Sequence, residues 1–126
     1  MLWTSITGIG AIFSGLAVGL GAFAAHGLKN RLDEYSLGVF ETAVKYQMYH
    51  ALALIALGLV ASRIDGLGIR IATVGFVLGI VIFSGSLYAL ALSGVRWLGA
   101  ITPIGGVAFL VAWIAFAWTC FKWSNQ

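Results

Sequence analysis

Long uncharged stretches alternate with short clusters of charged residues along the chain. The uncharged stretches cover residues 1–28, 46–62, 71–95 and 97–121, so they are 28, 17, 25 and 25 residues long. A helix needs about 20 apolar residues to cross the hydrocarbon core of a bilayer, and it satisfies its own backbone hydrogen bonds there. The pattern therefore predicts four transmembrane helices, near residues 3–26, 46–62, 71–94 and 97–121.

The composition agrees with this pattern. Hydrophobic residues make up 61 % of the chain and charged residues 9 %, whereas about a quarter of an ordinary soluble domain is charged. So few charges cannot supply the polar surface that a soluble core needs. We expect one all-α integral membrane domain over residues 1–126, with its four transmembrane helices in a bundle.

The basic residues fit a membrane anchor better than a nucleic-acid surface. The net charge is +3, but the Lys and Arg side chains stand at the predicted helix ends, where they reach the lipid headgroups. We therefore expect no nucleic-acid partner. Four spans place both termini on the same side. The seven Lys and Arg residues divide four to three between the two sides, which does not decide the orientation.

Residues 27–45 form the main polar segment and hold six of the eleven charges. Apolar side chains recur there at helical spacing in Leu37, Phe40 and Val44, and Glu41 precedes Lys45 by one helical turn, which is the favourable order. This pattern predicts an amphipathic helix at the membrane interface that continues or bends into the second span. The alternative is a solvated loop.

The chain contains 17 glycines, and small residues let helices approach closely in lipid. Several of them recur at four-residue spacing. This spacing predicts helix-packing roles, within one bundle or between copies of the chain, for Gly15, Gly19, Gly75, Gly79 and Gly85.

Two histidines flank the polar segment. His26 ends the first predicted helix, and His50 lies about one turn into the second, with Tyr46 and Gln47 on the same face. One interpretation is a metal or haem ligand pair, or a polar relay with Glu41. The other is that both histidines hydrogen-bond the polar segment and hold it on the bundle. Two histidines alone are too few for zinc, and we expect no metal and no cofactor.

A second group of polar residues lies in the last two spans. Ser84, Ser86 and Tyr88 fall in or near the middle of the third, and serine in a membrane helix usually bonds its own or a neighbouring backbone. Thr102 and Pro103 lie in the first turns of the fourth, where we expect proline to kink or open the helix. The alternative is a small polar cavity shared with the two serines.

The sequence contains no motif for catalysis. No Asp, Glu, Lys or Arg lies inside an apolar stretch, although ion-coupled transporters normally carry such a residue. No Ser/His/Asp set, phosphate loop or HExxH motif is present either. We expect a protein that is not an enzyme.

Four segments of the chain resemble the blocks of a known family. They are residues 21–28 (GAFAAHGL), 40–53 (FETAVKYQMYHALA), 83–88 (FSGSLY) and 97–106 (WLGAITPIGG). In this order they resemble the domain-of-unknown-function-423 family, the YgdD-like small bacterial inner-membrane proteins, although Ala24 stands where the family usually has Gly. The resemblance implies a multi-pass four-helix protein of the cytoplasmic (inner) membrane, without an established biochemical activity and without catalytic residues to transfer.

These observations lead to two functional hypotheses. The first is a non-enzymatic protein that organises the membrane or acts through membrane lipids, a second copy of the chain or another membrane protein. The alternative is a transporter-like protein that binds a small molecule or a lipid at a face formed by His26, His50, Ser84 and Thr102. A polar cavity open to one membrane surface would favour the second hypothesis.

Overall fold

The computed structural model describes residues 2–125, and this part of the chain is helical without any strand. The α-helices are α1 (Trp3–Phe23), α2 (Glu34–Ala61), α3 (Leu67–Gly79), α4 (Gly85–Ser93) and α5 (Thr102–Ser124). Two single π-helical turns, η1 (Ala24–Leu28) and η2 (Ile80–Ser84), extend α1 and join α3 to α4, and a 3₁₀ turn, η3 (Arg96–Ala100), precedes α5.

These elements make four continuous spans that are long and apolar enough to cross a membrane. They are Trp3–Leu28, Glu34–Ala61, Leu67–Ser93 and Arg96–Ser124. The four predicted transmembrane helices are therefore confirmed. With 26 to 29 residues at 1.5 Å per residue, each span exceeds a hydrocarbon core of about 30 Å, so its ends reach the headgroup regions.

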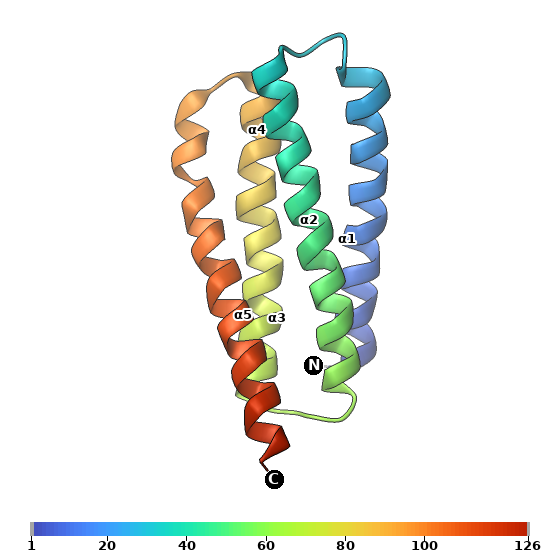
Figure 1. Ribbon diagram of the computed structural model, residues 1–126, viewed down its shortest axis with the longest axis vertical. Helices are drawn as coiled ribbons and strands as arrows, with labels where there is room; N and C mark the ends of the chain where they lie inside the picture. The colour runs from blue at the N-terminus through green and yellow to red at the C-terminus, as the bar shows by residue number, and fades with distance from the viewer. Residues whose placement is uncertain (1, 126) are drawn as a thin grey trace.

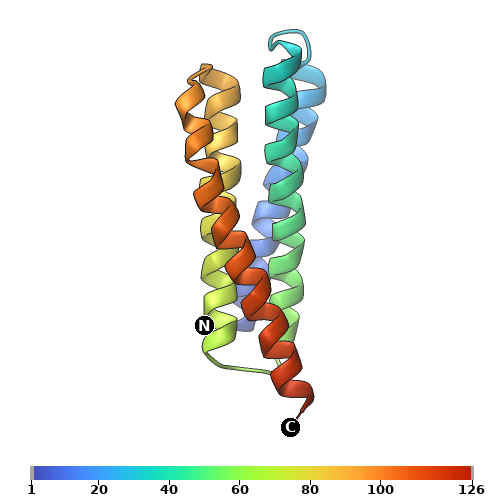
Figure 2. The ribbon, with the colours of Figure 1, turned by 60° about the vertical axis from the view of Figure 1, so that its left-hand side comes forward.

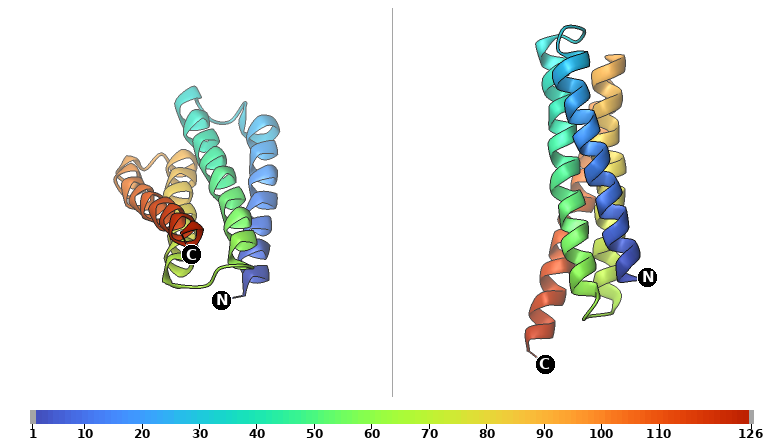
Figure 3. Two further views of the ribbon diagram at one scale, coloured as in Figure 1. Left: turned by 60° about the horizontal axis from the view of Figure 1, so that its bottom comes forward. Right: turned by 90° about the vertical axis from the view of Figure 1, so that its right-hand side faces the viewer.

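The spans lie side by side in the order α5, α3–α4, α2, α1 (Figure 1). The main packing is between neighbours in the sequence: α1 along α2, α2 along η2 and α4, and α5 along α3. Turned views show α1 and α5 on opposite flanks of the bundle (Figures 2 and 3). We compare the most apolar 18-residue stretch of each span. In the first span 17 % of this stretch is buried and in the last 22 %, whereas in each of the two inner spans 44 % is buried.

The polar segment forms a helix that continues into the second span, which is one of the two predicted arrangements. Most of the segment belongs to α2, which begins at Glu34 after the N-cap residue Asp33, so the amphipathic part and the second span are one continuous helix. The apolar stripe itself is as expected, because Phe40 is buried against η1 and α4 while Leu37 and Val44 pack beside it. These contacts hold the segment along the bundle as the first turns of the second span.

Pro103 does not kink a helix, so that prediction is wrong. It lies at the first turn of α5, directly after the 3₁₀ turn η3. Proline is well tolerated at this position because the first N–H groups of a helix have no intrahelical acceptor and its φ angle already suits the helix. The irregular backbone of this span therefore precedes Pro103.

Two of the five glycines expected to pack do so within the chain. A Cβ at Gly75 would lie 2.9 Å from the Ala108 carbonyl oxygen, and one at Gly79 would meet the Phe109 ring, so both let α3 approach α5 closely. A Cβ at any of three others would meet nothing within 4 Å: Gly15, Gly19 and Gly85. Four-residue spacing marks a face of a helix without saying whether that face is turned inward.

Candidate functional site

Gln47 connects three spans from a buried position in α2. Its amide nitrogen donates to the carbonyl oxygen of Phe13 in α1 at 2.9 Å. Its amide oxygen accepts from the Tyr88 hydroxyl in α4 at 2.7 Å. Both polar ends of the side chain are therefore satisfied by neighbouring helices, as a buried amide requires.

His50, about one turn further along α2, also connects this helix to another span. Nδ1 lies 2.7 Å from the carbonyl oxygen of Tyr46, and Nε2 accepts from the Trp113 indole nitrogen of α5 at 3.1 Å. Because a carbonyl only accepts and an indole only donates, this pattern corresponds to a neutral ring with the proton on Nδ1. The ring also stacks on Phe109, with centroids 3.5 Å apart.

The serines of the third span bond across helix interfaces. The Ser84 hydroxyl in η2 donates to the Ala43 carbonyl oxygen of α2 at 2.7 Å. The hydroxyls of Ser86 in α4 and Thr102 in α5 lie 2.6 Å apart, and Ser86 also bonds the Phe83 carbonyl oxygen. The expectation that such serines bond backbone or neighbouring helices describes all of these contacts.

The side chains of the remaining candidates take no part in these interhelical hydrogen bonds. His26 on η1 and both members of the Glu41 and Lys45 pair are exposed. Phe13 in the first span lies opposite Gln47, and His26 is thirteen residues further along that span, or about 20 Å, so the structure does not bring the two histidines together as a ligand pair. Tyr46 is 39 % exposed, and its ring packs on Phe83 with centroids 4.7 Å apart.

The structure adds partners that the sequence did not indicate. Two are backbone carbonyl groups, of Phe13 and Ala43, which no side-chain pattern can reveal. The others are Trp113 and Phe109 on α5. Their four-residue spacing is typical of any apolar helix face, so it does not single them out as partners of His50. Gly105 also matters, because a Cβ there would lie 2.8 Å from the Phe83 Cα, so its absence lets α5 approach the π turn η2.

The buried polar groups bond to one another or to backbone. Between residues 2 and 125, every buried side-chain nitrogen and oxygen atom has a hydrogen-bond partner. Over the same part of the chain, no three His, Cys, Asp or Glu residues group as metal ligands would. Chemically, the arrangement fixes helices relative to one another in a medium where an unpaired polar group costs several kcal/mol.

Two hollows lie on the outside of the bundle. The first, the aromatic groove, has a volume of about 460 Å³ and lies between α2, η2 and α5. Its lining consists mainly of aromatic side chains: Tyr46, Tyr49, His50, Phe83, Gly106, Phe109, Leu110 and Trp113. Only two of the predicted site residues, Tyr46 and His50, line it.

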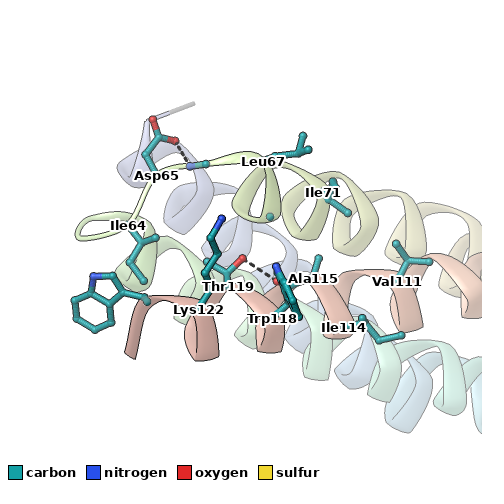
Figure 4. A pocket seen from close by; sticks show the side chains of 13 residues that line it. Ile64, Asp65, Leu67, Ile71, Val111, Ile114, Ala115, Trp118, Thr119 and Lys122 are labelled. Carbon is teal, nitrogen blue, oxygen red and sulfur yellow. Dashed lines mark hydrogen bonds between the residues drawn. The ribbon is translucent and has the colours of Figure 1, made fainter. Parts of the chain in front are cut away.

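The second hollow, the α3–α5 groove, is larger and begins at the end of the bundle where α3 starts (Figure 4). Its outer part has a volume of about 670 Å³, and an inner part of about 430 Å³ shares the residues Ile71 and Val111 with it. Three charged side chains line this groove: Asp65, Arg70 and Lys122. Of the residues predicted from the sequence, this lining includes the helix-packing glycine Gly75 and none of the candidate ligand residues.

Comparison with known proteins identifies relatives over nearly the whole chain. It is 50 % identical over 108 residues to the UPF0382 membrane protein YwdK of Bacillus subtilis, covering 84 % of this chain and 87 % of that protein. It is 50 % identical over 116 residues to a UPF0382 membrane protein of Staphylococcus saprophyticus, covering 90 % and 94 %. A UPF0382 membrane protein of Haemophilus influenzae is 46 % identical over 105 residues, covering 83 % and 84 %.

No solved structure shows a significant match to this fold. The sequence model of the family described as "Protein of unknown function (DUF423)" matches residues 20–106. This range includes the four segments that carry the resemblance, which it confirms. Together with the membrane-protein relatives and the four apolar spans, the match shows that the chain is a membrane protein of the DUF423 family.

Proposed function

We propose that this protein is a non-enzymatic component of the cytoplasmic membrane that acts through contacts with lipids or with other membrane proteins. One observation carries the proposal. The buried polar side chains that a ligand or reaction could use are bonded to each other and to backbone, as Gln47, His50 and Ser84 illustrate. Their arrangement suits helix-to-helix attachment rather than turnover of a substrate.

The lipid-facing surface supports the same proposal. The outer helices α1 and α5 bury less than a quarter of their most apolar windows, and both hollows open at the outside of the bundle. Small residues on such a surface let other helices pack closely against it. Candidate partners are membrane lipids, a second copy of the chain and another membrane protein.

This proposal is tested by extracting the full chain, with its surrounding bilayer, into polymer-bounded nanodiscs. Lipid and protein contents are then measured by mass spectrometry against nanodiscs that contain an unrelated four-helix protein. We expect a lipid class or a protein to be enriched at least about twofold over the control. Equal contents in both samples would overturn the proposal, and a co-purifying polar metabolite that is converted on incubation would show an enzyme instead.

A second candidate function rests on the aromatic groove. Its volume of about 460 Å³ falls within the range of small-molecule sites, and Tyr46 and His50 line it. This favours a transporter-like protein that binds an apolar molecule at this face. Titration of apolar fluorescent probes would distinguish it: quenching of tryptophan fluorescence that disappears in Trp113→Phe supports the second candidate, and quenching unchanged in that variant counts against it.

A further inference from the structure

The α3–α5 groove runs from one end of the bundle toward its middle. The antiparallel register places Gly68 beside Thr119 and Gly75 beside Ala112, so the two helices touch along this line, and the groove runs beside the contact. The lining extends along α5 from Lys122 to Ala108, which is about 21 Å at 1.5 Å per residue. This length exceeds half of a hydrocarbon core of about 30 Å, so the groove is as deep as one leaflet.

The walls of the groove are apolar for most of that length. Ile71, Val74 and Leu78 line it from α3, and Val111 and Ile114 line it from α5. All five side chains are exposed on the isolated chain, by 40 to 69 %. Such a surface is suited to an acyl chain, which fills the space without needing a hydrogen-bond partner.

The mouth of the groove is different, because a lysine and two indole rings lie there. Lys122 lies near the end of α5, and Figure 4 shows its side chain rising toward the start of α3. Trp118 and Trp123 line the same part, and indole rings prefer the headgroup level of a bilayer. The mouth therefore lies where a lipid headgroup would be.

Arg70 and Lys122 approach a common level from opposite directions. The register between α3 and α5 places Arg70 about five residues, or roughly 7 Å, deeper in the membrane than Lys122. Side chains lean toward the N-terminus of their own helix. Because the N-terminus of α3 is at the membrane surface and that of α5 is at the far side, Arg70 leans outward and Lys122 leans inward.

We propose that the α3–α5 groove binds one anionic phospholipid, with an acyl chain along the apolar walls and the phosphate between Arg70 and Lys122. This inference rests on the proposed function, since it names the lipid and the place where it binds. Guanidinium and ammonium groups both bind phosphate oxygens, and basic pockets between membrane helices recognise anionic headgroups. The structure therefore supplies both parts of the ligand with a matching surface.

The charge balance at the mouth selects an anionic lipid over a zwitterionic one. Among the described residues, Asp65 is the one carboxylate of the groove lining, and it accepts a hydrogen bond from the Gly66 backbone N–H at 2.8 Å. Arg70 and Lys122 against one engaged carboxylate leave the lining of the groove with a net positive charge. The ammonium group of phosphatidylethanolamine would be repelled there, whereas the glycerol headgroup of phosphatidylglycerol brings no positive charge.

The test is native mass spectrometry of the full chain in detergent, titrated with phosphatidylglycerol or phosphatidylethanolamine of identical acyl chains. We expect one phosphatidylglycerol molecule to bind the wild type several-fold more tightly than phosphatidylethanolamine. Arg70→Gln and Lys122→Gln should each weaken phosphatidylglycerol binding about fivefold. Arg63→Gln, which removes a cation at the same end of the bundle but outside the groove lining, is the matched control and should change it less than twofold.

A second pair of variants tests the acyl-chain part. Val111→Trp, which fills the groove, should weaken both lipids equally, whereas Val107→Trp, an exposed position on α5 outside the lining, should weaken neither. Thermal melting of each variant, with and without phosphatidylglycerol, reports whether it folds and whether the lipid-induced rise in Tm is lost.

Several outcomes would overturn the inference. They are equal losses in Arg63→Gln and Lys122→Gln, a wild-type preference for phosphatidylethanolamine that Asp65→Asn abolishes, or a dimer that Val111→Trp dissociates. In each case lipid or protein enrichment in the nanodiscs would still support the proposed function, so only the groove assignment falls. Absence of lipid binding together with absence of any enrichment would remove both.

Discussion

The indole nitrogen of Trp113 donates a hydrogen bond to Nε2 of His50 across the space between α5 and α2, at 3.1 Å. The two residues are 63 positions apart in sequence. The main backbone packing of α5 is against α3 and η2 rather than α2, so this bond, with the stacking of His50 on Phe109, ties the last span to the second. It makes His50 a structural residue of the interior.

Removing that donor should loosen the bundle. Trp113→Phe keeps an aromatic ring but leaves Nε2 of His50 without its partner, which we expect to cost about 0.5–1.5 kcal/mol of unfolding free energy. Reversible unfolding in mixed micelles measures the change. Trp97→Phe is the control, because Trp97 is 66 % exposed. Equal effects of the two substitutions would show that the hydrogen bond contributes nothing measurable.

Gln47 and Tyr88 should behave as a coupled pair. Gln47→Leu removes both interhelical bonds of the amide, whereas Tyr88→Phe removes only one, so the first substitution should be the more destabilising. A double-mutant cycle in the same micelles should give a coupling of about 0.6 kcal/mol, the average for such bonds in membrane proteins. Strictly additive effects would contradict the contact.

Two glycines of neighbouring spans should respond oppositely to alanine. Gly105→Ala places a methyl group against the Phe83 backbone and should cost about 1–3 kcal/mol, because backbone cannot move aside as a flexible side chain can. Gly85→Ala adds a methyl group in open space and should be neutral or stabilising by up to ~1 kcal/mol. The melting temperatures of the two variants test this prediction. A Gly105→Ala protein as stable as the wild type would disprove the close approach of α5 to η2.

Acid should weaken the start of α2. Hydrogen bonds from the backbone N–H and then the hydroxyl of Ser36 hold the pKa of Asp33 below its ordinary value of 3.8. The charged cap therefore stabilises the helix above that value, and its contribution is lost as the pH falls through the lowered pKa. The protection of the first-turn amides of α2 against hydrogen exchange, measured relative to an unstructured chain at the same pH, should fall at acid pH in the wild type. Asp33→Asn, a neutral cap, should make that fall disappear.

The sequence predicted the spans well because the free energy of inserting helices into a bilayer depends on a property that each segment carries by itself. Apolar length and the positions of charged residues decide it, and both are visible in residues such as Lys29, Arg63 and Arg96. The sequence left open whether the helix of the polar segment continues straight into the second span or bends. The continuation depends on Phe40 packing against η1 and α4, a tertiary contact that overrides the local polarity.

The candidate site was predicted less completely. Gln47, His50, Ser84, Ser86, Tyr88 and Thr102 all take part in interhelical bonds, so polarity in an apolar context is a good guide to such residues. Their partners were missed because Phe13 and Ala43 contribute only backbone oxygens. The α3–α5 groove was missed because Arg70 and Lys122 are 52 positions apart in sequence, and only the helix register brings them to one place.

The linear order of the spans has a consequence for biogenesis. Since each span packs mainly on the one that precedes it in the chain, every helix that leaves the insertion machinery finds its neighbour already in the bilayer. The second span docks on the first through Gly10 and Gly58, where a Cβ would lie 2.8 Å from the backbone of the partner, and the fourth docks on the third through Gly75 and Gly79. Contacts this local in sequence favour rapid association, so the protein can complete its fold in the order in which it is synthesised.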